Sequence, residues 1–284
     1  MSQLVNPYSQ APALVQALAL PASAYVGQRI ARTLLIEQIA NLPGTTAADK
    51  QLVNQLLAEL HWLAALKPAT CGLAAWQTDT HDYLEIAVLH AVLRPVSATL
   101  KHRSAAQHQR LLELIHRTIP YPVVLIISQP NVDGGTEQLS LAHKRLSLGT
   151  GSAMVLEQLA TTKSIAACAG IMGATAKFTQ YLAFNQGVSA PLSQCRDLYA
   201  RYSDWLHAIE ALAAAEHTGQ FTVSTTAPDA ARRRSALVAH DQLGQQLASL
   251  RAQARKESQL GQRAALNLKI AQLMAERQAL LSRL

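Results

Sequence analysis

Hydrophobic and polar positions in the first third of the chain predict two helices followed by two strands. Helical spacing is expected over residues 31–40 and again over 47–65. Pro68 ends the second pattern, and residues 70–76 and 83–94 then favour two strands of a hairpin. The leucines that define the second helical pattern are Leu52, Leu56, Leu57, Leu60 and Leu63.

The middle of the chain continues with one amphipathic helix and further strands. Residues 105–118 place leucine and isoleucine on one face and charges on the other, which predicts a surface helix. The unbroken apolar run 123–127 lies between prolines and predicts a central strand that is buried on both faces. Short strands are also expected at 139–146 and 153–156.

From residue 164 the pattern becomes helical, with candidate helices at 164–186 and 194–216. Strands that precede helices, without regular alternation, are typical of the α+β class. We therefore expect an α+β globular domain over residues 1–221, with strands mainly at 69–157 and helices at 164–216. The expected architecture is a mixed sheet of about five strands with flanking helices.

A polar segment, residues 222–229, predicts a linker before a basic coiled-coil tail over 230–284. The tail has two apolar stripes that are out of register with each other, so it is either one helix with a stutter or a two-helix hairpin. Gly261 lies between the stripes and favours a break. The stripes are Leu243, Leu247, Leu250 and Ala254, then Leu266, Ile270, Leu273, Arg277, Leu280 and Leu284.

Charge is concentrated in this tail. Residues 228–284 hold ten Lys and Arg against four Asp and Glu, a net charge of +6 out of +7 for the whole chain. Composition is 49% hydrophobic, enough for a sizeable core, yet no apolar run reaches the roughly 18 residues that a membrane span needs. Neither a signal peptide nor a disulfide or zinc pattern among three dispersed cysteines is recognisable, so a cytoplasmic location is expected.

Catalytic chemistry has one candidate, a divergent Mg²⁺-dependent nuclease. Asp79, Asp82 and Glu85 lie close together, as do carboxylates that hold Mg²⁺ in nucleases with an Asp and a Glu-x-Lys pattern. Ala87 stands where that lysine would be, so Lys144 would have to supply the charge. The alternative explanation for these three carboxylates is an ordinary solvent-exposed turn.

Other motifs do not support an enzyme. The Gly-Thr-Gly-Ser run at 149–152 lacks the remaining residues of a phosphate-binding loop and is read as a turn. The sequence has no Gly-x-Ser-x-Gly and no paired histidines of a metalloprotease. We expect no catalytic residue, no metal site and no cofactor.

Two sets of residues are candidate binding sites. Basic residues are candidates for contact with a nucleic-acid backbone, because each neutralised phosphate releases counterions. The second apolar stripe is the candidate interface for a partner helix. The basic set comprises Lys101, Arg103, Lys144, Arg145, Arg232, Arg233, Arg234, Arg255 and Lys256; the interface set comprises Leu266, Ile270, Leu273, Leu280 and Leu284.

Several stretches resemble a bacterial family of unknown function whose genes lie beside DNA methyltransferase and helicase genes in restriction-like antiphage defence loci. The resemblance spans nearly the whole chain and implies no catalytic residues, because the family has no agreed activity. The matching stretches are 119–127, 139–145, 198–202, 209–212, 218–221, 256–259 and 266–270.

This resemblance implies a partner in helicase or methyltransferase machinery. The expected function is therefore a non-catalytic adaptor of a bacterial DNA-targeting defence system, which binds a large enzyme and also DNA backbone. The alternatives are the divergent nuclease above and a homodimer that the coiled coil holds together, without any role on nucleic acid.

Overall fold

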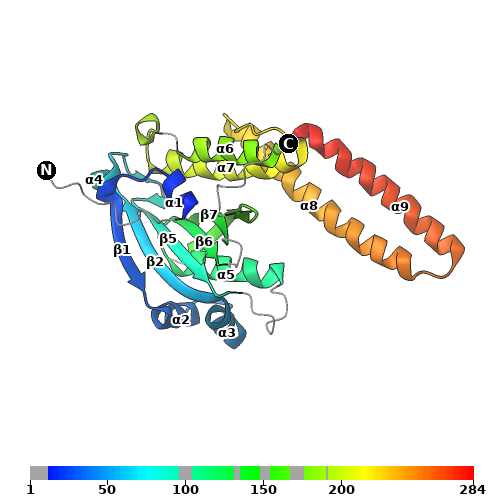
Figure 1. Cartoon of the computed structure of the whole chain (residues 1–284), viewed down its shortest axis with the longest axis horizontal. Coiled ribbons are helices and arrows are strands. Elements are labelled where there is room, and N and C mark those ends of the chain that lie inside the picture. The colour runs from blue at the N-terminus through cyan, green and yellow to red at the C-terminus, as the bar shows by residue number, and fades with distance from the viewer. Residues whose placement is uncertain (1–11, 96–103, 131–134, 148–153, 167–175, 190) are drawn as a thin grey trace. The chain divides into compact units, whose positions relative to one another are not determined.

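The computed structural model describes residues 12–95, 104–130, 135–147, 154–166, 176–189 and 191–284. Contacts divide the chain into two compact units (Figure 1). The first unit comprises 1–173 and 185–209, and the second comprises 174–184 and 210–284. The fold class is α+β, as predicted. Among the described residues, none of the helices combines the length and apolarity that crossing a bilayer requires.

A mixed sheet of seven strands forms the centre of the first unit (Figure 1). The strand order is β1-β2-β5-β6-β7-β8, with the short β9 also paired to β7. Among the described strands of this sheet, β5 and β6 pair in parallel and the other pairs are antiparallel. The strands are β1 (Tyr25–Ile30), β2 (Leu57–Leu66), β5 (Ile86–Leu93), β6 (Val123–Gln129), β7 (Thr136–Leu146), β8 (Met154–Thr161) and β9 (Ile165–Ala166); β3 (Trp76–Gln77) and β4 (Asp82–Tyr83) form a separate pair.

Strand β6 is the central buried strand that the apolar run predicted. Its side chains from Val123 to Ile126 are 0% exposed, and Ile127 is 1% exposed. β5 lies on one side and β7 on the other. A strand that is covered on both faces has no polar-out alternation, which explains the continuous run.

Three helices cover one face of the sheet: α2 (Arg32–Ala40), α3 (Ala47–Leu56) and α5 (Ala105–Thr118) (Figure 1). Their apolar faces form one core with β2, β5 and β6. An ion pair joins α3 to α5, because Arg110 Nε lies 2.9 Å from Asp49 Oδ1. Helices α2 and α5 occupy the predicted ranges to within a residue.

The first part of α7 (Leu198–Thr218) is attached to the strands through Tyr202. The Tyr202 hydroxyl accepts from the amide of Ala142 at 2.8 Å and donates to the carbonyl of Val123 at 2.8 Å. Glu137 of β7 accepts from the first amides of α1 (Ala13–Ala17), at 3.0 Å and 2.8 Å. Both side chains are buried and satisfy main-chain groups that would otherwise lack partners.

The predicted helix at 47–65 is wrong in its second half, which forms β2. Two β-bulges, between Leu57 and Glu59 and between Trp62 and Ala64, interrupt the strand. Each bulge shifts the inward-facing position by one residue, so the apolar residues no longer alternate with period two. The resulting spacing imitates a helix.

The predicted strand at 70–76 is also wrong. Residues Pro68–Cys71 form the short helix α4, and only Trp76 of that range joins a strand. Strand β5 was predicted, but its antiparallel partner is β2 rather than the 70–76 segment. The strands therefore extend from residue 25 to 166, beyond the predicted 69–157, and the sheet has more strands than expected.

The second unit is helical. Its elements are part of α6 (Ala176–Val188), the last turns of α7, α8 (Ala227–Lys256) and α9 (Leu260–Ala279). Gln180 of α6 donates to the carbonyl of Ala215 of α7 at 3.1 Å. The remaining short elements of the chain are η1 (Ala22–Ala24), η2 (Leu192–Gln194) and η3 (Leu280–Arg283).

Helices α8 and α9 pack along each other as a hairpin (Figure 1). The chain leaves α8 at Glu257 and re-enters a helix at Leu260. Of the two alternatives that the out-of-register stripes left open, the structure adopts the hairpin. The break falls just before Gly261.

Candidate functional site in the helical arm

We call the hairpin of α8 and α9, residues 227–279, the arm. Its base is fixed within the second unit. Thr226 caps α8 by accepting from the amide of Asp229 at 3.3 Å. Arg234 Nε lies 2.7 Å from a carboxylate oxygen of Glu210, which is 5% exposed. Arg233 donates to the main-chain oxygens of Thr222 at 2.6 Å and of Leu284 at 2.9 Å.

The seam of the arm consists of the two apolar stripes that the sequence showed. On α8, Leu247 and Ala254 of the seam are buried, at 2% and 8% exposure, whereas Leu243 and Leu250 are half-buried. The α9 stripe is only half-buried, and α9 has no fully buried residue. Arg277 replaces an apolar residue in this stripe, and its guanidinium lies over Gly244, where a Cβ atom would be 3.6 Å away. The two helices of the hairpin are therefore held together by a narrow apolar seam.

Positive charge is free at the end of the arm that contains the turn. The side chains of four residues, which we call the distal cations, form no ion pair in the part of the chain that the structure describes. Glu257, the acidic residue at the turn, accepts from the amide of Gln259 at 2.7 Å. The distal cations are Arg255, Lys256, Arg263 and Lys269, and all four are exposed.

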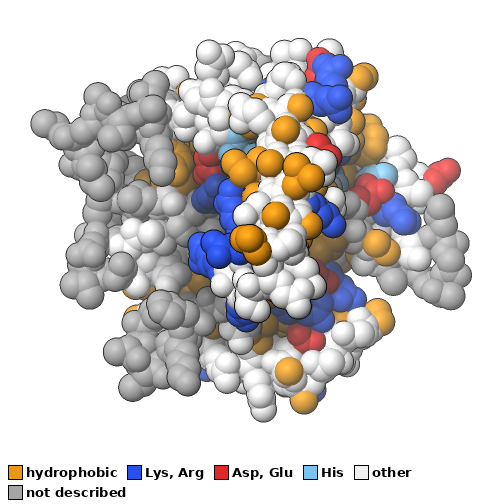
Figure 2. All heavy atoms as spheres, turned by 90° about the vertical axis from the view of Figure 1, so that its right-hand side faces the viewer, with side chains coloured by type: hydrophobic (Ala, Val, Ile, Leu, Met, Phe, Trp, Pro, Cys, Tyr) orange, Lys and Arg blue, Asp and Glu red, His pale blue; other side chains and the backbone are white. Residues whose placement is uncertain are grey.

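A groove of about 610 Å³ lies beside the turn, and its lining includes Lys256, Leu266 and Lys269. Large apolar side chains are exposed nearby: Leu260 is 83% exposed and Leu268 is 65% exposed. Figure 2 faces the arm and shows hydrophobic side chains in orange with Lys and Arg in blue beside them. Apolar side chains ringed by cations are typical of surfaces that bind a partner.

The predicted basic residues are not brought together. Lys101 and Arg103 lie outside the described residues. Lys144 is 1% exposed and donates to two carbonyls, so the prediction that it contacts nucleic acid is incompatible with its burial. Arg145 pairs with Glu157 at 3.2 Å.

The remaining basic residues separate into two sets within the arm. Arg232 forms an ion pair with Asp229, and together with Arg233 and Arg234 it belongs to the base. Arg255 and Lys256 are exposed near the turn. Arg263 and Lys269 of α9 were missed as candidates because they stand alone in sequence, and the hairpin places Lys269 on the same groove as Lys256.

The predicted interface residues were expected to face a partner helix, but they face α8 of the same chain. The half-buried positions Leu266, Ile270 and Leu273 belong to the side of α9 that forms the seam with α8. Leu280 and Leu284 lie in and after η3, which also contacts α8. The stripe is thus partly covered within the chain, and the more exposed apolar residues are on the rest of α9.

The carboxylates of the nuclease alternative do not converge in the described part of the chain. Glu85 pairs with Lys67 at 2.9 Å, and Asp82 accepts from the amide of Leu84 at 3.2 Å. No metal-ligand group of three that includes Asp79, Asp82 or Glu85 occurs among the described residues. The Gly-Thr-Gly-Ser run at 149–152 lies outside them.

A network of rings in the first unit was not predicted. Tyr83 shares a short hydrogen bond with His143 Nδ1, and Trp76 stacks on Tyr199 with ring centroids 4.1 Å apart. Ser203 lies 3.5 Å from His143 Nε2, yet its hydroxyl donates to the carbonyl of Tyr199 at 2.8 Å. Burial raises the pKa of Tyr83, which keeps the phenol neutral. These contacts pack the side chains of β3, β4, β7 and α7 against one another.

The fold and this site define an α+β protein with a basic helical arm. Residues 18–276 match a family described as "Domain of unknown function (DUF4391)". This match covers most of the chain, so the protein belongs to that family. No curated protein and no solved structure matches the chain.

Proposed function

We propose that the protein is a non-catalytic adaptor of a bacterial DNA-targeting defence system, and that the arm binds both a partner enzyme and the DNA backbone. The distal cations carry this proposal. Four exposed cations that form no ion pair with any described residue concentrate positive potential toward the end of a narrow hairpin. A cation that is not paired with a carboxylate of the protein contributes most to the binding of a phosphate.

Protein binding rests on the apolar residues of the same region. Leu260 and Leu268 expose more than half of their surface, beside a groove that both helices line. A partner helix that covers these side chains would remove apolar surface from water. The partner we propose is a DNA methyltransferase or helicase, in keeping with the family resemblance.

DNA binding is tested by fluorescence anisotropy with a duplex of arbitrary sequence over a range of salt concentrations. We expect replacement of the four distal cations by Gln to weaken binding for all sequences. The slope of log K against log salt should fall by up to about 3.6, since each duplex phosphate contact contributes about 0.9. The control replaces four exposed cations of the first unit by Gln: Arg29, Lys50, Lys163 and Arg196.

The control variant should bind like the wild type. Equal slopes for the wild type and the distal variant, or no binding by the wild type at physiological salt, would refute the DNA part of the proposal.

Protein binding is tested by affinity purification of the tagged chain from its host. Leu268→Asp should lose a methyltransferase or helicase that the wild type retains, and Val26→Asp, which changes a residue with 50% exposure on β1, should keep it. Retention by both variants, or a wild type that sediments only as a homodimer, would contradict this part.

A further inference from the structure

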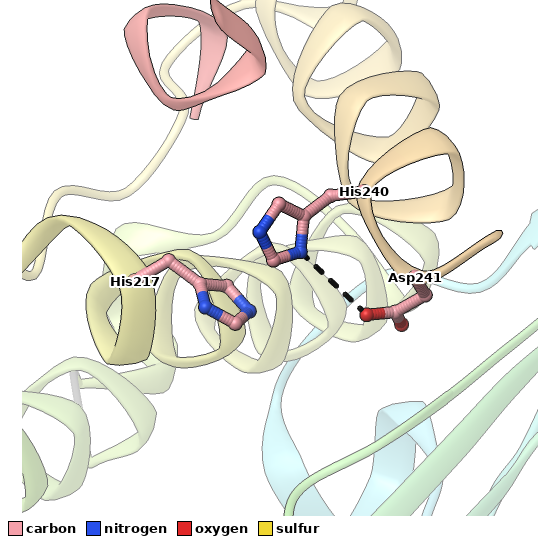
Figure 3. A group of neighbouring side chains, drawn as sticks. All are labelled: His217, His240 and Asp241. Atoms are coloured by element: carbon pink, nitrogen blue, oxygen red, sulfur yellow. Dashed lines mark ion pairs between the residues drawn. The ribbon is translucent and has the colours of Figure 1, made fainter. Parts of the chain in front are cut away.

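Two histidines and an aspartate meet in the second unit, close to the base of the arm (Figure 3). His217 lies in the last turn of α7, and His240 and Asp241 are neighbours on α8. The ring centroids of the two histidines are 4.1 Å apart, with their planes at 50°. One ligand atom from each residue lies within 4.8 Å of the other two.

The buried member of this group has an unused ligand atom. His240 is 4% exposed, and its Nδ1 atom is buried without a hydrogen-bond partner. Asp241 Oδ1 lies 3.8 Å from this nitrogen, which is too far for a hydrogen bond. A buried nitrogen without a partner is costly, and its lone pair is aimed at the space that the other two side chains surround (Figure 3).

We propose that His217, His240 and Asp241 bind one Zn²⁺ ion. Two imidazoles and a carboxylate are borderline ligands that suit zinc, with bond lengths of about 2.0–2.2 Å. Tetrahedral geometry would require donor atoms roughly 3.3–3.5 Å apart. The ligand atoms, now within 4.8 Å of one another, therefore need to move closer together on binding, which small side-chain rotations of both histidines and Asp241 would achieve, and water completes the coordination.

Some groups around the proposed site favour the binding of Zn²⁺ and one opposes it. The C-terminal end of α7, where His217 lies, carries partial negative charge. Desolvation lowers the pKa of His240, with His217 and Arg277 adding to the shift, which favours the neutral imidazole. Arg277 of α9 is the opposing group, because its positive charge repels a divalent ion. Replacing Arg277 by Gln should therefore tighten zinc binding several-fold.

Bound zinc would connect α7 directly to α8 across the connection that contains Gly219. The ligand bonds would then link the last turn of α7 to a point about four turns into α8, and so add to the hydrogen bonds that hold the two helices. This role is structural, and it does not depend on the DNA-binding or partner-binding functions proposed for the arm.

The experiment is isothermal titration of the full chain with Zn²⁺ alone, in a background with Cys71, Cys168 and Cys195 replaced by Ser to remove thiol binding. We expect one site per chain. His217→Ala and Asp241→Asn should each weaken binding by at least about 100-fold, since even outer partners of a ligand are worth 10–100-fold. Asp241 is 74% exposed, so its variant tests the site without threatening the fold.

His61→Ala is the matched control, because His61 also lies beside a histidine and a carboxylate, His90 and Glu59. This variant should bind zinc like the parent. Substitution with Co²⁺ should give the visible absorption bands of a nitrogen- and oxygen-ligated ion, and these bands should disappear in His217→Ala. No saturable zinc binding, or equal affinity in the parent, His217→Ala and Asp241→Asn, would overturn the proposal.

Discussion

Lys144 offers the sharpest test of the fold. Its side chain is 1% exposed, and Nζ donates to the carbonyls of Ile119 at 2.7 Å and Tyr121 at 2.6 Å. Burial lowers the pKa of Lys144 from 10.5 to about 7. The unfolded chain therefore binds a proton that the folded chain has lost between pH 7 and 10.5, so the free energy of unfolding should rise with pH over this window.

The magnitude follows from the size of the shift. A fall from 10.5 to about 7 corresponds to at most about 4.8 kcal/mol, at 1.36 kcal/mol per pKa unit. The two carbonyls also favour the charged ammonium, which reduces the effect, and we expect about 2–4 kcal/mol. Below pH 7 the lysine is protonated in both states, so no further change is expected there.

The perturbation is Lys144→Met, which keeps the unbranched side chain and removes the titrating group. Urea unfolding followed by circular dichroism gives the free energy of unfolding for both proteins from pH 6 to 10.5. The wild type minus variant difference should rise with pH, because the other lysines and tyrosines cancel. Lys50→Met, at an exposed position, should give a flat difference. A flat difference for Lys144→Met as well would mean that the ammonium stays charged when buried, and the reasoning would be refuted.

Three further variants test the packing. Asp49→Asn removes the charged acceptor of the Arg110 hydrogen bonds that hold the pKa of Asp49 at about 2, so the free energy of unfolding at pH 7 should fall by about 1–2 kcal/mol. In urea titrations this difference from the wild type should vanish as the pH falls from 4 to 2. Leu125→Asp should abolish soluble expression by burying an unpaired carboxylate, and a folded variant would exclude a central β6. Arg234→Met should lower the free energy of unfolding by about 1–3 kcal/mol in urea titrations, because it removes the partner of the buried Glu210 carboxylate, and adding Glu210→Met should restore most of this loss.

Much of the fold could be predicted because, in most helices and strands, the apolar residues recur with the single period typical of that element. The apolar run at 123–127 and the amphipathic pattern at 105–118 each have a single interpretation, and both were correct. Strand β2 could not be predicted in the same way, since its two bulges remove the alternation that identifies a strand. Strand β1 is largely exposed and has almost no apolar pattern to detect.

The candidate sites were harder to predict than the fold. The positive charge of the tail was visible in the sequence. Which cations form ion pairs or hydrogen bonds at the base, and which remain unpaired among the described residues near the turn, depends on the contacts that the folded hairpin makes. His217 and His240 are 23 positions apart in sequence and follow no ligand motif. Only the packing of α7 against α8 brings them together, so spacing rules had no means of detecting them.

The lack of any fully buried residue in α9 has a consequence for how the arm opens. Local unfolding of a segment costs only the contacts that it loses, and α9 would lose a half-buried stripe against one helix. Its amide protons should therefore exchange with solvent long before those of β6, through detachment that leaves the sheet intact. A partner that binds docked α9 would slow this exchange, which makes protection of residues 260–279 a direct measure of arm occupancy.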